Sequence, residues 1–163
     1  MIVISDASVF INLAIIGQLD LLPAIFGKIT VPQAVFQEVV TAGATKPGSE
    51  ELRTAKWLEV QNCTDEILLN RLLRSLDKGE AEAITLACEL NADLLIIDER
   101  RGRGIAQSLN LQITGLLGVL LTAKKKGLID AVKLLMVRLQ DEADFRIGAE
   151  TFRVVLEAAG EGY

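Results

Sequence analysis

The sequence predicts an α/β fold in which a parallel sheet carries helices on both faces. Short runs of apolar and β-branched residues alternate along the chain with longer segments whose apolar residues recur at helical spacing. Two of the short runs, 2–4 and 94–97, lead into acidic residues: Asp6 after the first, and Asp98 with Glu99 after the second. Because the carboxyl ends of parallel strands meet at one edge of a sheet, where ligands bind, these acidic ends are expected to lie close together.

The N-terminal half is expected to contain, in chain order, a strand over 2–4, helices over 9–13 and 19–26, a strand over 28–31, a helix over 32–40 and a loop over 41–49. Gly17 and Gly27 separate the first two helices from the segments that follow them. Pro32 suits the first turn of the third helix, because no backbone donor is needed there and its fixed φ is helical. The loop is rich in glycine and proline and is expected to be a flap rather than a linker between domains.

The C-terminal half is expected to contain a strand over 57–60, a helix over 65–73, a helix over 76–90, a strand over 94–97, a helix over 102–109, a strand over 111–114, a helix over 115–126, and helices over 129–139 and 149–159. Thr64 is the expected cap of the helix over 65–73. Ala83 and Ala87 let the helix over 76–90 pack closely against its neighbours. Gly127 follows the helix over 115–126, where a glycine cap is typical.

The 163 residues are expected to form one domain, with 128–163 as its closing helices. Half of the residues are hydrophobic, but no uninterrupted apolar run approaches the length that spans a bilayer. We therefore expect a large apolar core together with a homodimer interface. The chain begins with a strand and shows no secretory signal, so a cytoplasmic location without membrane contact is expected.

The chain contains no histidine, which excludes Ser-His-Asp and Cys-His catalysis as well as zinc held by histidine. Cys63 and Cys88 are expected to be free thiols. The formal net charge of -5 argues against a protein that coats nucleic acid by its overall charge, so any RNA contact requires a local basic patch. Hydrolysis by this chain would have to depend on carboxylates, hydroxyls, lysines or a bound cation.

Four acidic residues, Asp6, Glu38, Glu82 and Asp98, come from separate elements that a parallel sheet can bring to one edge. Carboxylates at close range repel one another, so such a cluster either has raised pKa values or binds a cation. Mg²⁺ or Mn²⁺ suits oxygen ligands best. The chemistry this favours is metal-assisted hydrolysis of a phosphodiester, in which the ion activates water and stabilises charge on the phosphate.

Several short motifs accompany these acids along the chain. They are Asp6-Ala7-Ser8, Val31-Pro32 with Glu38, Gly79-Glu80-Ala81-Glu82-Ala83-Ile84, Ile97-Asp98-Glu99-Arg100-Arg101-Gly102-Arg103 and Thr114-Gly115-Leu116-Leu117-Gly118. With them the sequence resembles the PIN-domain ribonucleases over most of residues 1–127. The resemblance implies a three-layer α/β/α fold with a mainly parallel central sheet, a Mg²⁺ or Mn²⁺ site and endonucleolytic cleavage of RNA. It also implies a toxin-like protein with a small antitoxin as its partner.

Carried over by position, the resemblance makes Asp6 the first metal-binding and catalytic acid and Glu38 the second. Glu82 takes the third acidic place and Asp98 the fourth. Helix caps at Asp6 and Asp98, and a solvated side chain at Glu38, are the structural alternatives.

Three further residues stay open as alternatives or helpers at the same site. Glu80 precedes Glu82 by two residues and points in a different direction, so either one can be the ligand. Glu99 replaces Asp98 if the strand ends one residue later. Ser8 is placed to orient Asp6 or a metal-bound water.

Arg100, Arg101 and Arg103 begin the helix after Asp98 and are candidates for contacts with RNA phosphates, because guanidinium groups bond phosphate oxygens in pairs. Their alternative is a solvated helix start. Two other functions remain open for the chain as a whole. One is a non-catalytic PIN-like module that binds a protein partner, and the other is a phosphoacceptor domain, which fits less well because Asp6 has no acidic neighbour.

Overall fold

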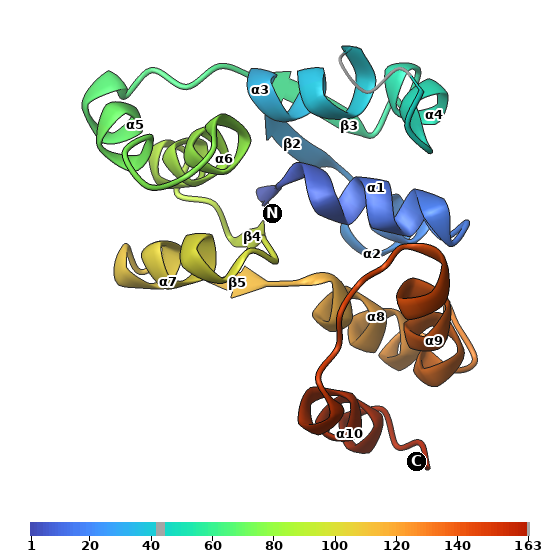
Figure 1. Cartoon of the computed structure of the whole chain (residues 1–163). Helices are drawn as coiled ribbons and strands as arrows, with labels where there is room; N and C mark the ends of the chain where they lie inside the picture. Colours follow the sequence, from blue (N-terminus) through green and yellow to red (C-terminus); the bar gives the residue numbers. More distant parts are fainter. Residues whose placement is uncertain (42–44, 163) are drawn as a thin grey trace.

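In a computed structural model, which describes residues 1–41 and 45–162, a five-stranded parallel sheet lies between layers of helices (Figure 1). The strands are β1 (Val3–Ser5), β2 (Ile29–Pro32), β3 (Leu58–Gln61), β4 (Leu94–Ile96) and β5 (Ile113–Thr114). Their order in the sheet is β3-β2-β1-β4-β5, and each neighbouring pair is parallel. The three-layer α/β/α fold expected from the sequence is confirmed.

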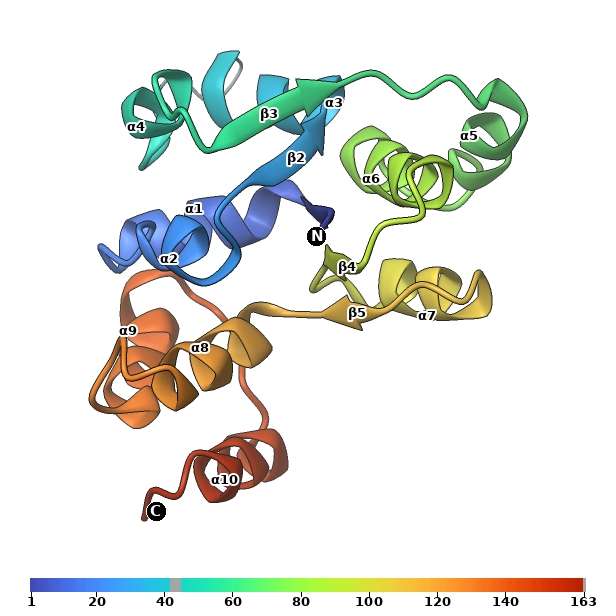
Figure 2. The same cartoon turned by 180° about the vertical axis from the view of Figure 1, so that it is seen from behind.

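The helices are α1 (Ala7–Ile15), α2 (Leu21–Phe26), α3 (Gln33–Phe36), the π-helix η1 (Gln37–Thr41), α4 (Ser49–Arg53), α5 (Glu66–Leu72), α6 (Lys78–Glu89), α7 (Arg100–Ser108), α8 (Leu116–Lys125), α9 (Val132–Glu142) and α10 (Ala149–Ala158). Seen from both sides, α5, α6 and α7 lie at one end of the molecule, and α8, α9 and α10 lie at another (Figures 1 and 2). Most of these elements begin and end within a few residues of the bounds predicted from the sequence.

The strands separate two apolar cores because successive side chains point to opposite faces. Val3 and Ile96 belong to the core that α1, α2, α8 and α9 cover, whereas Ile4 and Leu95 belong to the core that α6 and α7 cover. All four side chains are almost completely buried. This two-sided burial explains why β1 and β4 are mostly apolar in the sequence.

The central strands β1 and β4 are paired so that their carboxyl ends coincide. Ser5 lies beside Ile96, and the backbone amide of Asp6 donates to the Ile96 carbonyl at 3.0 Å. The residues that follow both strands therefore leave the sheet at the same edge. This register brings the two acidic strand ends together, as expected from the sequence.

Some local expectations were wrong. The helix expected over 32–40 is a single α-helical turn followed by a π-helix, and Pro32 ends β2 instead of occupying the first helical turn. The cap of α5 is Asp65, whose Oδ1 accepts from the amide of Leu68 at 3.0 Å, and not Thr64. The short helix α4 begins inside the segment expected to be a loop over 41–49, of which residues 42–44 lie outside the described part.

Glu161, which follows α10, contacts both α8 and α9. Its carboxylate accepts from the amides of Val132 at 2.6 Å and Lys133 at 3.0 Å, and it pairs with Lys124 at 2.9 Å. It thus joins the end of α10 to the start of α9 and to α8. Among the described helices, none is long and apolar enough to cross a membrane.

Candidate metal centre

A pocket of about 230 Å³ opens at the carboxyl edge of the sheet. Its lining contains five acidic residues and no basic one: Asp6, Glu38, Asp77, Glu80 and Glu99, together with Ala7, Ser8 and Gly79. The five acids come from four separate places in the chain: the segments after β1 and β4, the π-helix η1, and the start of α6, which supplies Asp77 and Glu80. We call this site the acidic pocket.

Asp6 is the most deeply buried of the five acids, with 5% of its surface exposed. Its Oδ1 accepts from the hydroxyl of Ser8 at 3.2 Å and from the amide of Val9 at 3.3 Å, and so caps α1. Its Oδ2 accepts from the amide of Asp98 at 3.3 Å. Burial, helped by the charge of Asp98, raises the pKa of Asp6 to about 7 in spite of these hydrogen bonds.

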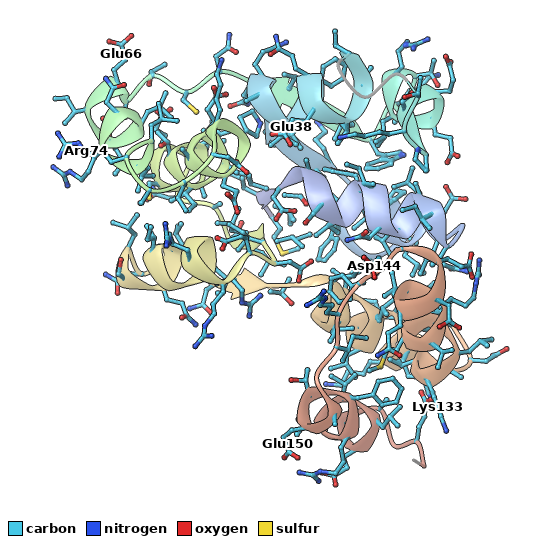
Figure 3. The ribbon with its side chains drawn as sticks, in the orientation of Figure 1. Glu38, Glu66, Arg74, Lys133, Asp144 and Glu150 are labelled. Carbon is cyan, nitrogen blue, oxygen red and sulfur yellow. The ribbon has the colours of Figure 1, made fainter. Side chains whose placement is uncertain are left out.

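Glu38 reaches the acidic pocket from the π-helix η1. In Figure 3 its side chain points inward, whereas Glu66 and Arg74 point outward. Burial and the charge of Asp77 raise the pKa of Glu38, and Lys46 opposes that rise. A π-helical turn shifts the direction of the side chains that follow it, and such turns occur often at functional sites.

Glu38 packs directly against the backbone of Gly79 in the first turn of α6. A Cβ atom at position 79 would overlap Glu38 Oε1, so any other residue there would push the carboxylate aside. Gly79 therefore has a steric function, because it leaves room for an acidic side chain from another element.

Glu80 lines the acidic pocket beside Asp77, the cap of α6. The Oδ1 atom of Asp77 accepts from the amide of Glu80 at 2.9 Å. Burial, a side-chain hydrogen bond with Asp77 and the charges of Asp77 and Glu99 raise the pKa of Glu80 to about 8. The hydrogen bond donated by the amide of Gly102 lowers the pKa of Glu99, which caps α7.

Glu82 and Asp98 do not line the acidic pocket. Glu82 is buried, and its Oε1 accepts from the amide of Ala34 at 3.1 Å, at the start of α3. The carboxylate of Asp98 accepts from the amide of Leu116 at 3.0 Å, at the start of α8. Burial raises the pKa of Asp98, against the hydrogen bond from Leu116 and the charge of Arg103. Both side chains thus hold helices in place, and their roles as metal ligands stay predictions.

The three arginines that follow Asp98 have different surroundings. Arg103 donates from Nη1 to the carbonyl of Ile97 at 2.8 Å, and Arg101 donates to the carbonyl of Ser75 at 3.3 Å. Arg100 is exposed beside Arg101, in a shallow depression on the outer side of α7. Arg103 is therefore the arginine held closest to the end of β4.

Asp77 is the pocket acid that the reasoning from sequence missed. The spacing of Asp77 and Glu80 is that of a capping box, in which a helix cap and the third helical residue bind each other's amides. That signal identifies the start of α6. It does not show that the same two carboxylates face Asp6 and Glu38 across a cavity, because this depends on how α6 packs against the sheet.

Carboxylate oxygens without a basic partner are the donors that Mg²⁺ and Mn²⁺ prefer, so the chemistry of the acidic pocket fits such an ion. Burial, with the charges of neighbouring carboxylates, raises the pKa values of Asp6, Glu38 and Glu80, and a bound cation would favour their charged forms. Among the described residues, no three Asp, Glu or Cys side chains already converge on one point as metal ligands do. Asp6, Glu38 and Glu80 line the pocket together and are the candidates to hold a divalent ion.

Comparisons with known proteins agree with the fold and with the resemblance stated above. The family described as PIN domain matches residues 2–161. Among solved structures, the chain is similar to a PilT N-terminus domain protein from the archaeon Sulfolobus solfataricus P2, with a TM-score of 0.55 and 17% identity over 73% of this chain and 90% of that chain. That likeness shows the fold alone, and no curated protein has a significant match. Since the family match spans nearly the whole sequence, this chain belongs to the PIN domain family.

Proposed function

We propose that this PIN domain protein is a divalent-metal-dependent endoribonuclease that hydrolyses RNA phosphodiester bonds. The observation that carries the proposal is the acidic pocket, in which Asp6, Glu38 and Glu80 face one another from separate elements without a basic residue in the lining. The family supports a nuclease in general. RNA as the substrate and Mg²⁺ or Mn²⁺ as the ion are parts of this proposal and not of the family match.

In the proposed reaction Asp6, Glu38 and Glu80 would hold the ion together. A bound Mg²⁺ or Mn²⁺ would supply a water that attacks at neutral pH and would stabilise negative charge on the phosphate. Asp6 is fixed by hydrogen bonds from Ser8, Val9 and Asp98, so it presents a carboxylate of constant position. Glu80, which lines the pocket with Asp6 and Glu38, would offer a further carboxylate to the ion.

Ser8 and Asp98 act through Asp6 in this proposal. The Ser8 hydroxyl donates to Asp6 Oδ1, and the Asp98 amide donates to Asp6 Oδ2. Both contacts fix the orientation of the Asp6 carboxylate toward the pocket. We therefore regard them as positioning residues.

The test is cleavage of a labelled single-stranded RNA in Mn²⁺ or Mg²⁺, with EDTA as the metal-free control. We expect the protein to cleave RNA only with the ion, and we expect Asp6→Asn to abolish cleavage without unfolding the chain. Glu66→Gln is the matched control, because Glu66 is an exposed acid on α5 that points away from the pocket (Figure 3). Full activity of Asp6→Asn would contradict the proposal.

A non-catalytic PIN domain that binds a protein partner is the second candidate function. Its supporting observation is that, within the described residues, no three acidic or thiol side chains already converge as metal ligands. Calorimetry with Mn²⁺ separates the two candidates. Binding that Asp6→Asn removes supports the nuclease, whereas absence of binding supports the interaction module.

The sequence-based proposals of a toxin role with a small antitoxin partner, and of a homodimer, remain to be tested. Leu134 and Val137, three residues apart on α9, expose apolar surface and are candidates for a dimer contact. Light scattering at micromolar concentration tests the dimer, and a purely monomeric protein would exclude it.

A further inference from the structure

A second pocket, of about 340 Å³, is lined by Asp98, which does not line the acidic pocket. One wall is the start of α8, and the other is the linker and first turns of α10, residues 145–155. Figures 1 and 2 show that the linker between α9 and α10 passes beside the first part of α8. We call this site the arginine pocket, after Arg103 and Arg146 in its lining.

The charge of the arginine pocket is opposite to that of the acidic pocket. Among the described residues of its lining, Asp98 is the only acid, and its carboxylate already accepts from the amide of Leu116. Arg103 uses Nη1 for the carbonyl of Ile97 and retains further N–H donors. Arg146 is exposed and forms no hydrogen bond or ion pair with any other described residue. The lining therefore has a net positive charge in a chain whose formal charge is -5.

The rest of the lining suits a nucleotide better than a free inorganic anion. Thr151 adds a hydroxyl beside the arginines, and Leu117, Phe145 and Ile147 supply apolar surface. Paired guanidinium groups match the oxygens of a phosphodiester, and apolar or aromatic side chains cover a ribose or a base.

The two pockets are joined through one hydrogen bond, from the amide of Asp98 to Asp6 Oδ2 at 3.3 Å. A strand whose scissile phosphate lies at the acidic pocket would therefore place a neighbouring nucleotide at Asp98. We propose that the arginine pocket binds a flanking phosphodiester of the single-stranded RNA substrate through Arg103 and Arg146. This inference rests on the proposed ribonuclease function and adds the path of the substrate.

The test measures binding of a short fluorescein-labelled single-stranded RNA to the full chain by fluorescence anisotropy, in EDTA so that the RNA stays intact. Arg146→Ala is expected to weaken binding about three- to tenfold, the loss of one charged contact. The slope of log Kd against log salt should fall by about 0.7, the value for one phosphate contact on a single strand. Arg146→Lys keeps the charge and should retain most of the salt dependence.

Arg74→Ala is the matched control, because Arg74 is an exposed arginine near α5 that points away from both pockets (Figure 3). Equal affinity and equal salt dependence for Arg146→Ala and the parent protein would overturn the inference, as would a parent protein that does not bind the RNA. Cleavage of the same RNA in Mn²⁺ tests the proposed function separately. If the parent protein cleaves the RNA but Arg146→Ala binds it as tightly as the parent does, only the proposal for the arginine pocket is overturned. If Arg146→Ala binds more weakly but the parent protein does not cleave, only the proposed nuclease function is overturned.

Discussion

The backbone amide of Asp98 donates a hydrogen bond to the carboxylate of Asp6, at 3.3 Å from Oδ2. The bond joins the ends of β1 and β4, whose pairing places Ser5 beside Ile96. Asp6 is thereby fixed by three donors and yet is buried next to another acid, which raises its pKa to about 7. Hydrogen bonds thus hold the Asp6 carboxylate in a position where its negative charge is unfavourable.

Asp6 should make the metal-free protein less stable as the pH rises. Its pKa is raised in the folded state, so the folded chain binds more protons than the unfolded chain between about pH 4 and about pH 7, and stability falls across that interval. The loss is at most about 4 kcal/mol, at about 1.4 kcal/mol for each unit of pKa. Asp6→Asn should remove this loss, so its free energy of unfolding relative to the parent rises from about pH 4 to about pH 7. Urea unfolding in EDTA measures it.

Glu66→Gln serves as the control for that series, because its side chain is exposed. Its stability should follow the pH dependence of the parent protein. If Asp6→Asn also followed that dependence, the burial of a charged Asp6 would be disproved.

Glu80 and Glu82 should differ in what their loss affects. Glu80→Gln is expected to lower cleavage about tenfold or more with little change in stability, because Glu80 lines the acidic pocket. Glu82→Ala is expected to cost about 1 to 3 kcal/mol of stability, because it leaves the amide of Ala34 without its acceptor. Cleavage assays measure the activity of both variants, and urea unfolding measures their stability. Loss of cleavage in a stable Glu82 variant, with full activity of Glu80→Gln, would reverse the assignment.

Gly79→Ala should impair the site without weakening the fold. The added Cβ would overlap Glu38 Oε1 and displace that carboxylate, while alanine favours the helix by about 0.5 to 1 kcal/mol. We expect weaker Mn²⁺ binding in calorimetry and an unchanged or higher melting temperature. The control is Gly104→Ala in α7, where nothing lies within 4 Å of the added atom. Equal Mn²⁺ affinity in the two variants would show that Gly79 does not position Glu38.

Glu161 should determine how firmly α10 is attached. Its side chain is 13% exposed and accepts from the amides of Val132 and Lys133 and from Lys124. Glu161→Ala is expected to cost about 1 to 3 kcal/mol and to accelerate amide hydrogen exchange in α10 more than in α6. Uniform protection in both helices would contradict this attachment.

The central strands β1 and β4 could be predicted from the sequence because they are largely buried and appear as apolar runs, whereas the edge strands β3 and β5 are only partly buried. The parallel arrangement followed from the alternation of short apolar strands with helices along the chain. The π-helix η1 could not be predicted, since a single i to i+5 turn has no apolar period of its own. Helix α4 is too short to show a period.

The positions of the candidate site residues could be predicted in part from the sequence. The directions in which their side chains point could not. Asp6 and Glu38 lie where their elements were expected to bring them. Glu82 and Asp98 come from the expected elements, but their carboxylates bind the starts of α3 and α8. Sequence spacing identifies the helix face and the strand end of a residue. It does not show which neighbouring amide competes for its carboxylate, since this depends on tertiary packing.

The central claim is that the acidic pocket holds a divalent cation, and a crystal soaked in Mn²⁺ tests it most directly. An anomalous difference map is predicted to show a peak in the pocket, with carboxylate oxygens of Asp6 and of Glu38 or Glu80 around it. A map without a peak there, or with a peak ligated by residues outside the pocket, would contradict the account.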